Sequence, residues 1–191
     1  MARPDRTRRA VLDAATLVLS KDSGASLAEV ATVAGVGRTT LHRYFPTREA
    51  LVRALVGDAL DHVAQAITDA KPQEGPVADA LQRIADSVIP QGPSLRFLYA
   101  EPSVYAAHEM MRRWYDALEP VAEAVRRGQS EGSIRAHLPV SWVVDTFAGT
   151  ILTAWDSVEE GRLARHEAPR LVMNALLYGV AEPAHTPGRA P

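Results

Sequence analysis

The chain has 191 residues, 47% of them hydrophobic, no cysteine and a formal net charge of −2. This composition permits a sizeable buried core and excludes a disulfide framework and thiol chemistry. The charge is unevenly divided, because residues 1–53 hold nine Lys and Arg against five acids, whereas residues 54–191 hold twelve against eighteen. A basic N-terminal part on an acidic remainder is typical of a protein that presents one end to a polyanion, with chance asymmetry as the alternative.

The N-terminal segment combines a basic start with an apolar run and could be mistaken for a secretory signal. Asp13 interrupts the apolar run, and no small-residue cleavage site follows it. Val11, Ala14, Ala15 and Val18 instead share one helical face and predict a first helix. Four arginines precede or begin this face and would either add salt-sensitive affinity for a polyanion or form a frayed, solvated arm: Arg3, Arg6, Arg8 and Arg9.

Residues 26–45 predict two short helices joined by a tight turn. Ser26 can accept a hydrogen bond from the amide of Glu29, and the Glu29 side chain can reach back to Ser26, which is the pattern of a capping box. Gly35 suits a turn that needs a positive φ, and Gly37 can cap the second helix.

The second of these helices should end before Pro46 and turn Leu41 and Phe45 inward. Its remaining side chains are left for solvent or a partner. A helix-turn-helix motif places its second helix in the major groove of DNA. The side chains available for such contacts are Arg38, Thr39, Thr40, His42 and Arg43.

The run AGVGRTTLHRYFPTREAL, residues 34–51, resembles the signature of the TetR (tetracycline repressor) family of bacterial transcriptional regulators. The family wording is close to AGVS-x-GTLY-x-HF-x-SKE-x-L. This chain departs from it at Gly37, which replaces a serine cap, at Thr39, which replaces a glycine, and at His42, which replaces a phosphate-binding tyrosine. The close match covers about the first quarter of the chain, and the remainder resembles the family only in length and helical pattern.

The resemblance implies a DNA-binding surface around the second helix of the motif. Arg38 can bind guanine through two hydrogen bonds, and Arg43 lies one turn past Thr39. Arg48 matches the family's phosphate-binding lysine, whereas solvated arginines and a packing role for Tyr44 are the alternatives. The predicted DNA-binding residues are Ser26, Arg38, Thr39, Thr40, His42, Arg43, Tyr44 and Arg48.

The rest of the chain shows helical spacing and no convincing strand, so we expect an all-α protein. The resemblance implies an N-terminal three-helix helix-turn-helix head and a larger C-terminal helical body for ligand binding and dimerisation. The predicted domains are residues 1–53, followed by a linking helix to about 70, and residues 54–185, with a disordered tail at 186–191. Pro120 is expected to kink a long helix, and residues 90–94 are expected to break one. Further helices are predicted at about 76–89, 104–127, 140–160 and 166–181, with a short apolar segment at 95–99.

The last two predicted helices are apolar on several faces, which is unusual for helices of a small monomer. The resemblance implies that they pack against their twins as a four-helix dimer interface, with an ordinary monomeric core as the alternative. A two-fold dimer would also match operator half-sites about one helical turn, ~34–36 Å, apart. The predicted interface residues are Ile151, Trp155, Val172, Ala175, Leu176 and Gly179.

The resemblance further implies a small-molecule effector inside the body, which changes the spacing of the two heads and releases DNA. The aromatic and methionine content indicates an apolar or aromatic effector, and repression is the family's common mode, although these residues could equally form plain core. The predicted ligand-binding residues are Phe97, Tyr99, Tyr105, His108, Met111, Trp114, Tyr115, Trp142, Asp145, Phe147 and Trp155.

Two other functions are alternatives to DNA binding. The run GQSEG at 128–132 formally matches the G-x-S-x-G nucleophile motif of hydrolases, but a helical pattern precedes it where that motif needs a strand. A helical protein-interaction module or an activator without ligand-induced release is the other alternative. We therefore expect a non-enzymatic, cytoplasmic regulator that binds double-stranded operator DNA as a homodimer, with no metal, no cofactor and no membrane span.

Overall fold

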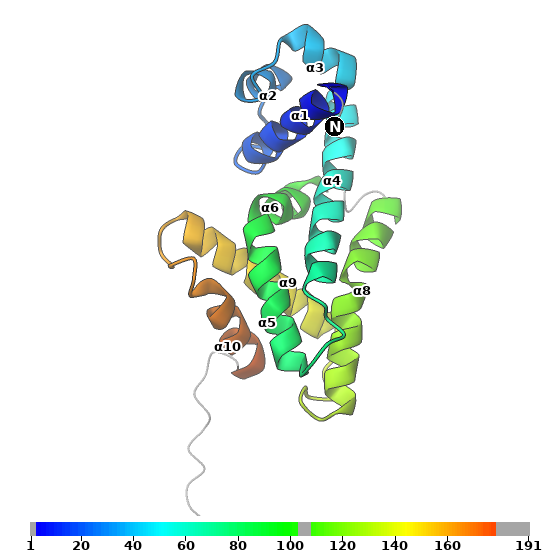
Figure 1. The fold of residues 1–191 in the computed structure, drawn as a ribbon, viewed down its shortest axis with the longest axis vertical. Helices are drawn as coiled ribbons and strands as arrows, with labels where there is room; N and C mark the ends of the chain where they lie inside the picture. The colour runs from blue at the N-terminus through cyan, green and yellow to red at the C-terminus, as the bar shows by residue number, and fades with distance from the viewer. Residues whose placement is uncertain (1–2, 103–107, 179–191) are drawn as a thin grey trace, which may run out of the picture.

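The computed structural model describes residues 3–102 and 108–178, and every regular element within these ranges is a helix. The all-α fold class is confirmed. Figure 1 shows an elongated molecule with the N-terminal helices at one end and the larger bundle below them. The helices are α1 (Arg3–Leu19), α2 (Leu27–Val33), α3 (Arg38–Tyr44), α4 (Arg48–Asp69), α5 (Val77–Val88), the 3-10 turn η1 (Ile89–Gln91), α6 (Gly92–Ala100), α8 (His108–Ser130), α9 (Val140–Glu159) and α10 (Ala168–Tyr178).

The head consists of α1, α2, α3 and the first turns of α4. Val11 and Leu12 on α1 pack with Leu41 on α3 and Leu51 on α4, and all four side chains are buried. Phe45 ends α3 and is also buried. The sequence prediction that Leu41 and Phe45 point inward is therefore confirmed.

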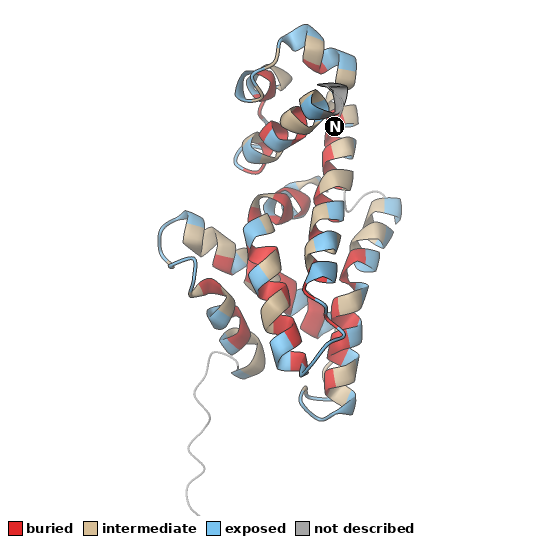
Figure 2. Ribbon diagram, in the orientation of Figure 1, coloured by how far each residue is buried: buried red, intermediate tan, exposed pale blue. Residues whose placement is uncertain are grey.

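Helix α4 joins the head to the body, which comprises the rest of α4 together with α5, α6, α8, α9 and α10 (Figure 1). Its apolar stripe begins with Leu51 and Leu55 and continues through Val63 to Ile67, so one helix contributes to the packing at both ends of the molecule. Figure 2 shows the buried residues running along the side of α4 that faces the neighbouring helices. The buried residues of head and body form one continuous hydrophobic cluster.

Helix α5 ends at Val88, so the predicted break near residues 90–94 is present, but it is shorter than predicted. Only the 3-10 turn η1 separates α5 from α6, and α6 already begins at Gly92. Pro90 and Pro93 each occupy one of the first positions of a helical element, where a missing N–H costs no intrahelical hydrogen bond. The prolines therefore start new helical elements instead of forming a loop.

The other predicted helices are found with small shifts at their ends. Helix α8 continues to Ser130, three residues past the predicted end, with Pro120 in its interior. The predicted start of this helix at about residue 104 and the predicted tail at 186–191 lie outside the described residues.

Candidate nucleic-acid interface and effector cavity

The capping box at the start of α2 is present in full. The Glu29 amide donates to Ser26 Oγ at 3.3 Å, and Glu29 Oε2 accepts from the Ser26 amide at 2.7 Å. The hydrogen bond from the Ser26 backbone, followed by that from its hydroxyl, lowers the pKa of the Glu29 carboxyl below its usual value. These bonds satisfy donors at the helix start and fix the direction in which α2 leaves the preceding loop.

The turn between α2 and α3 has the geometry that the sequence predicts. Gly35 has a φ of 65°, and the Val36 amide donates to the Ala31 carbonyl at 3.0 Å across the turn. Gly37 then caps α3 in an extended conformation without a side-chain hydrogen bond. The turn therefore sets α3 at an angle to α2 and presents one of its faces to solvent, as Figure 1 shows at the tip of the head.

The outer face of α3 carries cationic and hydroxyl groups. Arg38, Thr39, His42 and Arg43 are exposed, whereas Thr40 and Tyr44 are half-buried. Arg38 has no hydrogen bond or ion pair with any residue that the structure describes, so its guanidinium is available to a partner. The guanidinium of Arg43 lies 5.3 Å from the centre of the Tyr44 ring, a cation–π distance.

Arg48, which the sequence predicts as a phosphate contact, has partners within the protein. Its guanidinium donates to the Ala25 carbonyl at 2.5 Å and also to the Ser23 carbonyl. Arg48 therefore holds the loop between α1 and α2. Sequence reasoning missed this role because the acceptors are backbone atoms more than twenty residues away.

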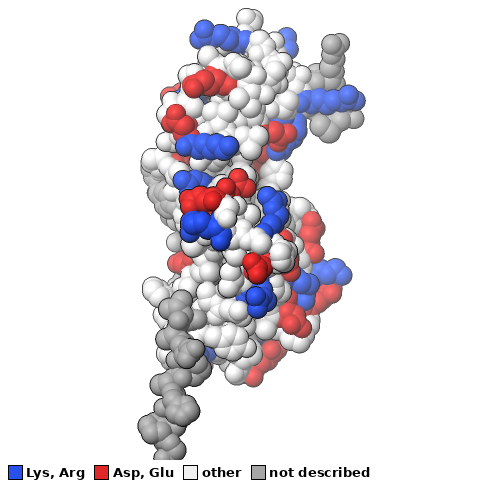
Figure 3. All heavy atoms as spheres, turned by 90° about the vertical axis from the view of Figure 1, so that its left-hand side faces the viewer, with Lys and Arg blue, Asp and Glu red and all other residues white. Residues whose placement is uncertain are grey.

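The N-terminal arginines are part of a helix and not of a frayed arm, because α1 begins at Arg3. Arg9 bonds Asp13 at 2.5 Å and Asp58 of α4 at 2.6 Å, and these partners raise the pKa of Arg9, with the hydrogen bond to Asp13 the largest contribution. The guanidinium of Arg8 lies 5.8 Å from the centre of the Phe45 ring. Arg8 and Arg9 thus stabilise the head itself. In Figure 3, Lys and Arg side chains lie at the outermost end of the head, and charges of both signs alternate along the body.

The body contains a small apolar cavity of about 20 Å³ between α4, α5, α6, α8 and α9. We call it the effector cavity, after the ligand that the sequence predicts for the body. Trp114 and Phe147 are the predicted ligand-binding residues that line it. Tyr99 packs edge-on against Trp114 with ring centres 5.6 Å apart, and Phe97 is buried in the core nearby. The full lining comprises Val63, Ile67, Ile84, Val88, Leu95, Trp114, Leu118, Val121, Val144, Phe147, Ala148 and Ile151.

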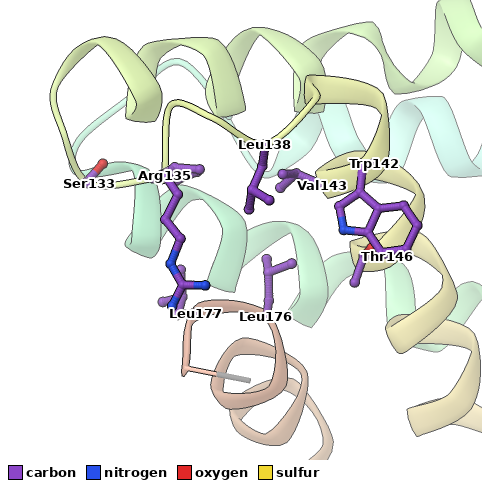
Figure 4. A pocket seen from close by; sticks show the side chains of 9 residues that line it. Ser133, Arg135, Leu138, Trp142, Val143, Thr146, Leu176 and Leu177 are labelled. Atoms are coloured by element: carbon purple, nitrogen blue, oxygen red, sulfur yellow. The ribbon is translucent and has the colours of Figure 1, made fainter. Parts of the chain in front are cut away.

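The other predicted ligand-binding residues are not brought to this cavity. His108, Tyr115 and Asp145 are exposed, Met111 and Trp155 are half-buried, and Tyr105 lies outside the described residues. Trp142 is 63% exposed and lines a different pocket of about 160 Å³, which is formed by the loop after α8, the start of α9 and the end of α10. Figure 4 shows Arg135 extending over this pocket toward Leu177, with Trp142 at its other side. Helical periodicity alone could not separate cavity residues from surface ones on these helices.

The predicted dimer interface needs correction at two positions. Ile151 and Val172 are only 2% and 1% exposed, so the core of the chain itself already uses these side chains. Trp155, Ala175 and Leu176 are half-buried, and Gly179 lies outside the described residues. The exposed apolar side chains on α9 and α10 are Trp142, Leu171 and Tyr178. Sequence reasoning missed the last two, although their spacing of seven residues places them on one side of a helix.

The enzymatic alternative has no structural support. Gly128 and Ser130 of the GQSEG run lie within α8, where no strand precedes the serine. Among residues 3–102 and 108–178, no group of three or more His, Asp or Glu could hold a metal ion. No helix in the described part of the chain has the length and apolarity needed to cross a membrane.

The head is a helix-turn-helix whose second helix is basic and exposed, and one long helix joins it to a helical body with an apolar cavity. Together these features define a DNA-binding regulator. The family profile described as "Bacterial regulatory proteins, tetR family" matches residues 11–55. The HTH-type transcriptional repressor LfrR of Mycolicibacterium smegmatis is 37% identical over 176 residues, which cover 92% of this chain and 91% of LfrR. The HTH-type transcriptional regulator NfxB of Pseudomonas aeruginosa is 27% identical over 164 residues, 85% of this chain and 88% of NfxB.

Solved structures agree with the sequence relatives. The crystal structure of LfrR from Mycobacterium smegmatis in complex with proflavine has a TM-score of 0.79 at 36% identity, covering 93% of this chain and 98% of LfrR. A TetR family regulator from Marinobacter aquaeolei has a TM-score of 0.76 at 21% identity and shares the fold, over 95% and 98% of the two chains. The chain belongs to the TetR family of transcriptional regulators. Because this family is not enzymatic, the rejection of the hydrolase interpretation is confirmed.

Proposed function

We propose that this protein is a repressor that binds a palindromic operator as a homodimer and leaves it when a planar aromatic effector enters the effector cavity. The observation that carries the DNA-binding part is the outer face of α3, where Arg38 has no partner in the described chain and exposed Thr39, His42 and Arg43 surround it. We place the division between the DNA-binding residues 1–53 and the ligand-binding residues 54–185 inside α4. The protein would act in the cytoplasm, where its operator lies.

The exposed apolar side chains of α9 and α10 support dimerisation. Trp142, Leu171 and Tyr178 are 63%, 43% and 75% exposed in the single chain. Large apolar side chains in solvent-facing positions of neighbouring helices mark interaction surfaces. A second copy packed on these two helices would cover them and would pair two α3 helices for successive grooves of DNA.

The effector cavity supports an aromatic ligand because Trp114 and Phe147 face it and its lining is apolar. At about 20 Å³ it holds little more than one water molecule, whereas pockets for drug-sized ligands occupy roughly 300–1,000 Å³. An effector would therefore have to displace side chains and helices in order to enter. That requirement couples binding to a change of conformation, because the ligand stabilises only the expanded state. LfrR, which is similar to this chain, was crystallised with proflavine, a planar aromatic molecule.

A gel-shift assay tests the proposal. It uses the purified protein and the DNA upstream of its own gene, at a series of salt concentrations, with and without proflavine. We expect a discrete, competitor-resistant shift with a two-half-site footprint, which proflavine abolishes. A diffuse shift that disappears at modest salt would contradict operator binding and point to nonspecific charge. A sharp shift that proflavine leaves unchanged would contradict this class of effector.

A pair of neighbouring aromatic residues tests the location of the effector. Trp114→Leu removes the indole from the cavity wall, and we expect it to weaken proflavine binding by about tenfold, on the order of 1.4 kcal/mol. Tyr115→Leu is the matched control, because Tyr115 is 56% exposed and does not line the cavity. Titration of proflavine fluorescence measures both affinities, and equal losses in the two variants would place the effector elsewhere.

A further inference from the structure

Residues 20–25 form a corner between α1 and α2 whose backbone carbonyls are held by two arginines from other parts of the fold. The carbonyl groups beyond the last turn of a helix have no intrahelical donor and need partners from outside. Arg48, at the start of α4, donates to the carbonyls of Ser23 and Ala25. Arg96, in the middle of α6, donates through Nε to the Ser20 carbonyl at 3.2 Å. The corner is thus fastened once to the linking helix and once to the body.

The guanidinium of Arg96 has a second partner on a third helix. Its Nη1 lies 2.6 Å from Asp156 Oδ1 on α9. The same planar group therefore bonds Ser20, 76 positions upstream, and Asp156, 60 positions downstream in the chain. A guanidinium presents its donors in a rigid fork, so the positions of both acceptors are coupled to each other. Arg96 therefore joins the head, α6 and α9 through one side chain.

Helices α6 and α9 are also in tight contact one turn before this bridge. A Cβ atom built on Gly92 would lie 2.0 Å from ring carbons of Trp155, so the backbone of α6 rests directly on the indole. Gly92 and Arg96 on α6 thus meet Trp155 and Asp156, which are adjacent on α9. This close packing leaves α6 no room to approach α9 further.

The same two helices form part of the wall of the effector cavity. Leu95, the neighbour of Arg96, lines the cavity from α6, and Ile151 lines it one turn before Trp155 on α9. Expanding a cavity of about 20 Å³ around an aromatic molecule must displace some of its walls. Any displacement of α6 relative to α9 or α1 changes the distances from the Arg96 guanidinium to its two acceptors.

We propose that Arg96 is a positioning residue that couples the state of the effector cavity to the DNA-binding head. This inference rests on the proposed function, because it assumes that an effector expands the cavity. In the unexpanded cavity Arg96 holds the corner by the Ser20 carbonyl and is itself oriented by Asp156. Expansion of the cavity displaces α6 and breaks or redirects the hydrogen bond from Arg96 to the Ser20 carbonyl. The head can then move away from the orientation in which it fits DNA. A ligand shifts such an equilibrium only by its preference for one state, and Arg96 supplies contacts that differ between the states.

The coupling is measured as the ratio of operator dissociation constants with and without saturating proflavine, by fluorescence anisotropy of labelled operator. For the wild type we expect a ratio on the order of tenfold or more, and for Arg96→Ala a ratio below about threefold. The free Arg96→Ala protein should bind proflavine no more weakly than the wild type, because the lost bonds stabilise only the unexpanded cavity. Arg126→Ala is the matched control, because Arg126 forms a similar exposed ion pair with Glu119 at 2.9 Å, within α8 alone. An Arg96→Ala ratio equal to those of the wild type and the control would overturn the proposal.

Asp156→Asn provides a second variant in case Arg96→Ala folds poorly. It leaves Arg96 in place but removes the charge that orients it, so we expect a reduced coupling ratio. In the double variant the loss should be no greater than with Arg96→Ala alone, because Asp156 acts through Arg96. If the double variant lost more of the coupling ratio than Arg96→Ala alone, Asp156 would act independently of Arg96. That result would contradict the proposal that Asp156 acts by orienting Arg96.

Amide hydrogen exchange distinguishes failure of this inference from failure of the proposed effector. The amides of Lys21 and Asp22 donate to the Val18 carbonyl, and the Ala25 amide donates to the Asp22 carbonyl, so their exchange reports on the corner without any ligand. We expect exchange at these amides to be at least about threefold faster in Arg96→Ala than in Arg126→Ala. If proflavine does not release the wild type, this comparison decides the role of Arg96, and equal exchange rates would overturn it.

Discussion

At the scale of single residues, the arginines of the head differ in what they contact. Arg38 is exposed and has no partner among the described residues, whereas Arg48 and Arg9 are bound to groups of the protein itself. A guanidinium already satisfied by carbonyls or carboxylates gains less from binding DNA than a free one, because it must first give up those bonds. Base recognition is therefore expected from Arg38 in preference to Arg48.

Arg38→Ala should weaken operator binding and relax its sequence specificity. Losing a bidentate contact with guanine costs about 1–3 kcal/mol, or roughly fivefold to more than a hundredfold in affinity. The melting temperature should stay close to that of the wild type, because the side chain is exposed. Anisotropy titrations with the operator and with a scrambled sequence measure the effect.

Arg112→Ala removes the same charge from an exposed position on α8 and serves as the control for Arg38→Ala. It should leave operator affinity unchanged within about twofold, since a remote surface charge contributes little at physiological salt. Equal losses in the two variants would mean that α3 does not read bases through Arg38.

Ser26→Ala tests the capping box and its dependence on pH. Loss of the hydroxyl cap should destabilise the protein by about 1 kcal/mol at pH 7. The hydrogen bonds from Ser26 hold the pKa of Glu29 below its usual value. The stability from the Glu29 carboxylate is therefore present above its unfolded-state pKa and is lost as the pH falls through its lower folded-state pKa.

The difference between Ser26→Ala and wild type should accordingly narrow in acid, which urea unfolding at a series of pH values will measure. In the variant, NMR titration of the Glu29 carboxyl should give a pKa closer to its usual value, although the Ser26 backbone amide remains as a donor. An unchanged Glu29 titration would show that the hydroxyl contributes nothing to this shift.

At the scale of the elements, helix existence was predictable wherever apolar residues repeat at helical spacing. Helices α2 and α3 follow from their caps and from Leu41 and Phe45, and α4 follows from one long apolar stripe. The start of α6 was not predicted, because Pro90 and Pro93 suggest a loop when the ends of the flanking helices are unknown. The same prolines fit a helix start as soon as their position in it is known.

Gly92→Ala should strain the contact between α6 and α9. Its Cβ would meet Trp155 ring carbons at 2.0 Å, a distance that forces the indole or the helix to move. We expect a loss of about 1–3 kcal/mol of stability, as for overpacked cores, and a changed tryptophan emission spectrum.

Gly57→Ala is the control for Gly92→Ala, because its added Cβ would meet only the end of the flexible Arg113 side chain, at 3.4 Å. Gly57 lies inside α4, where alanine is the better helix former, so a gain of about 0.5–1 kcal/mol is expected. Unfolding of both variants at equal concentration measures the pair, and a stable Gly92→Ala protein would contradict the tight contact.

At the scale of the whole molecule, the apolar side chains exposed on α9 and α10 predict a dimer. Leu171→Asp should shift the mass in sedimentation equilibrium from dimer toward monomer, because it places a charge on the exposed face of α10. Leu171 is a cleaner test than Leu176, which is half-buried and also packs against the core.

Leu17→Asp places the same charge on a similarly exposed leucine of α1 and should leave the mass unchanged. If Leu171→Asp also retained the wild-type mass, the interface would not include this face of α10.

Features that depend on neighbours within one or two helical turns could be predicted from the amino-acid sequence. The capping box of Ser26 and Glu29, the turn at Gly35 and the inward side of α3 are local, and helix geometry alone brings their atoms together. The family signature lies in the same segment. The domain boundary after residue 53 stays a prediction, because α4 runs through it without a break.

Contacts between groups far apart in the chain could not be predicted, because they depend on the tertiary structure. It directed Arg48 to the carbonyls of the corner, Arg9 to Asp58 and Arg96 to both Ser20 and Asp156. It also buried Ile151 and Val172 while leaving Leu171 exposed on helices that look apolar on several sides. The physical reason is that long side chains and apolar stripes accept many partners, and only the packing of the helices selects one.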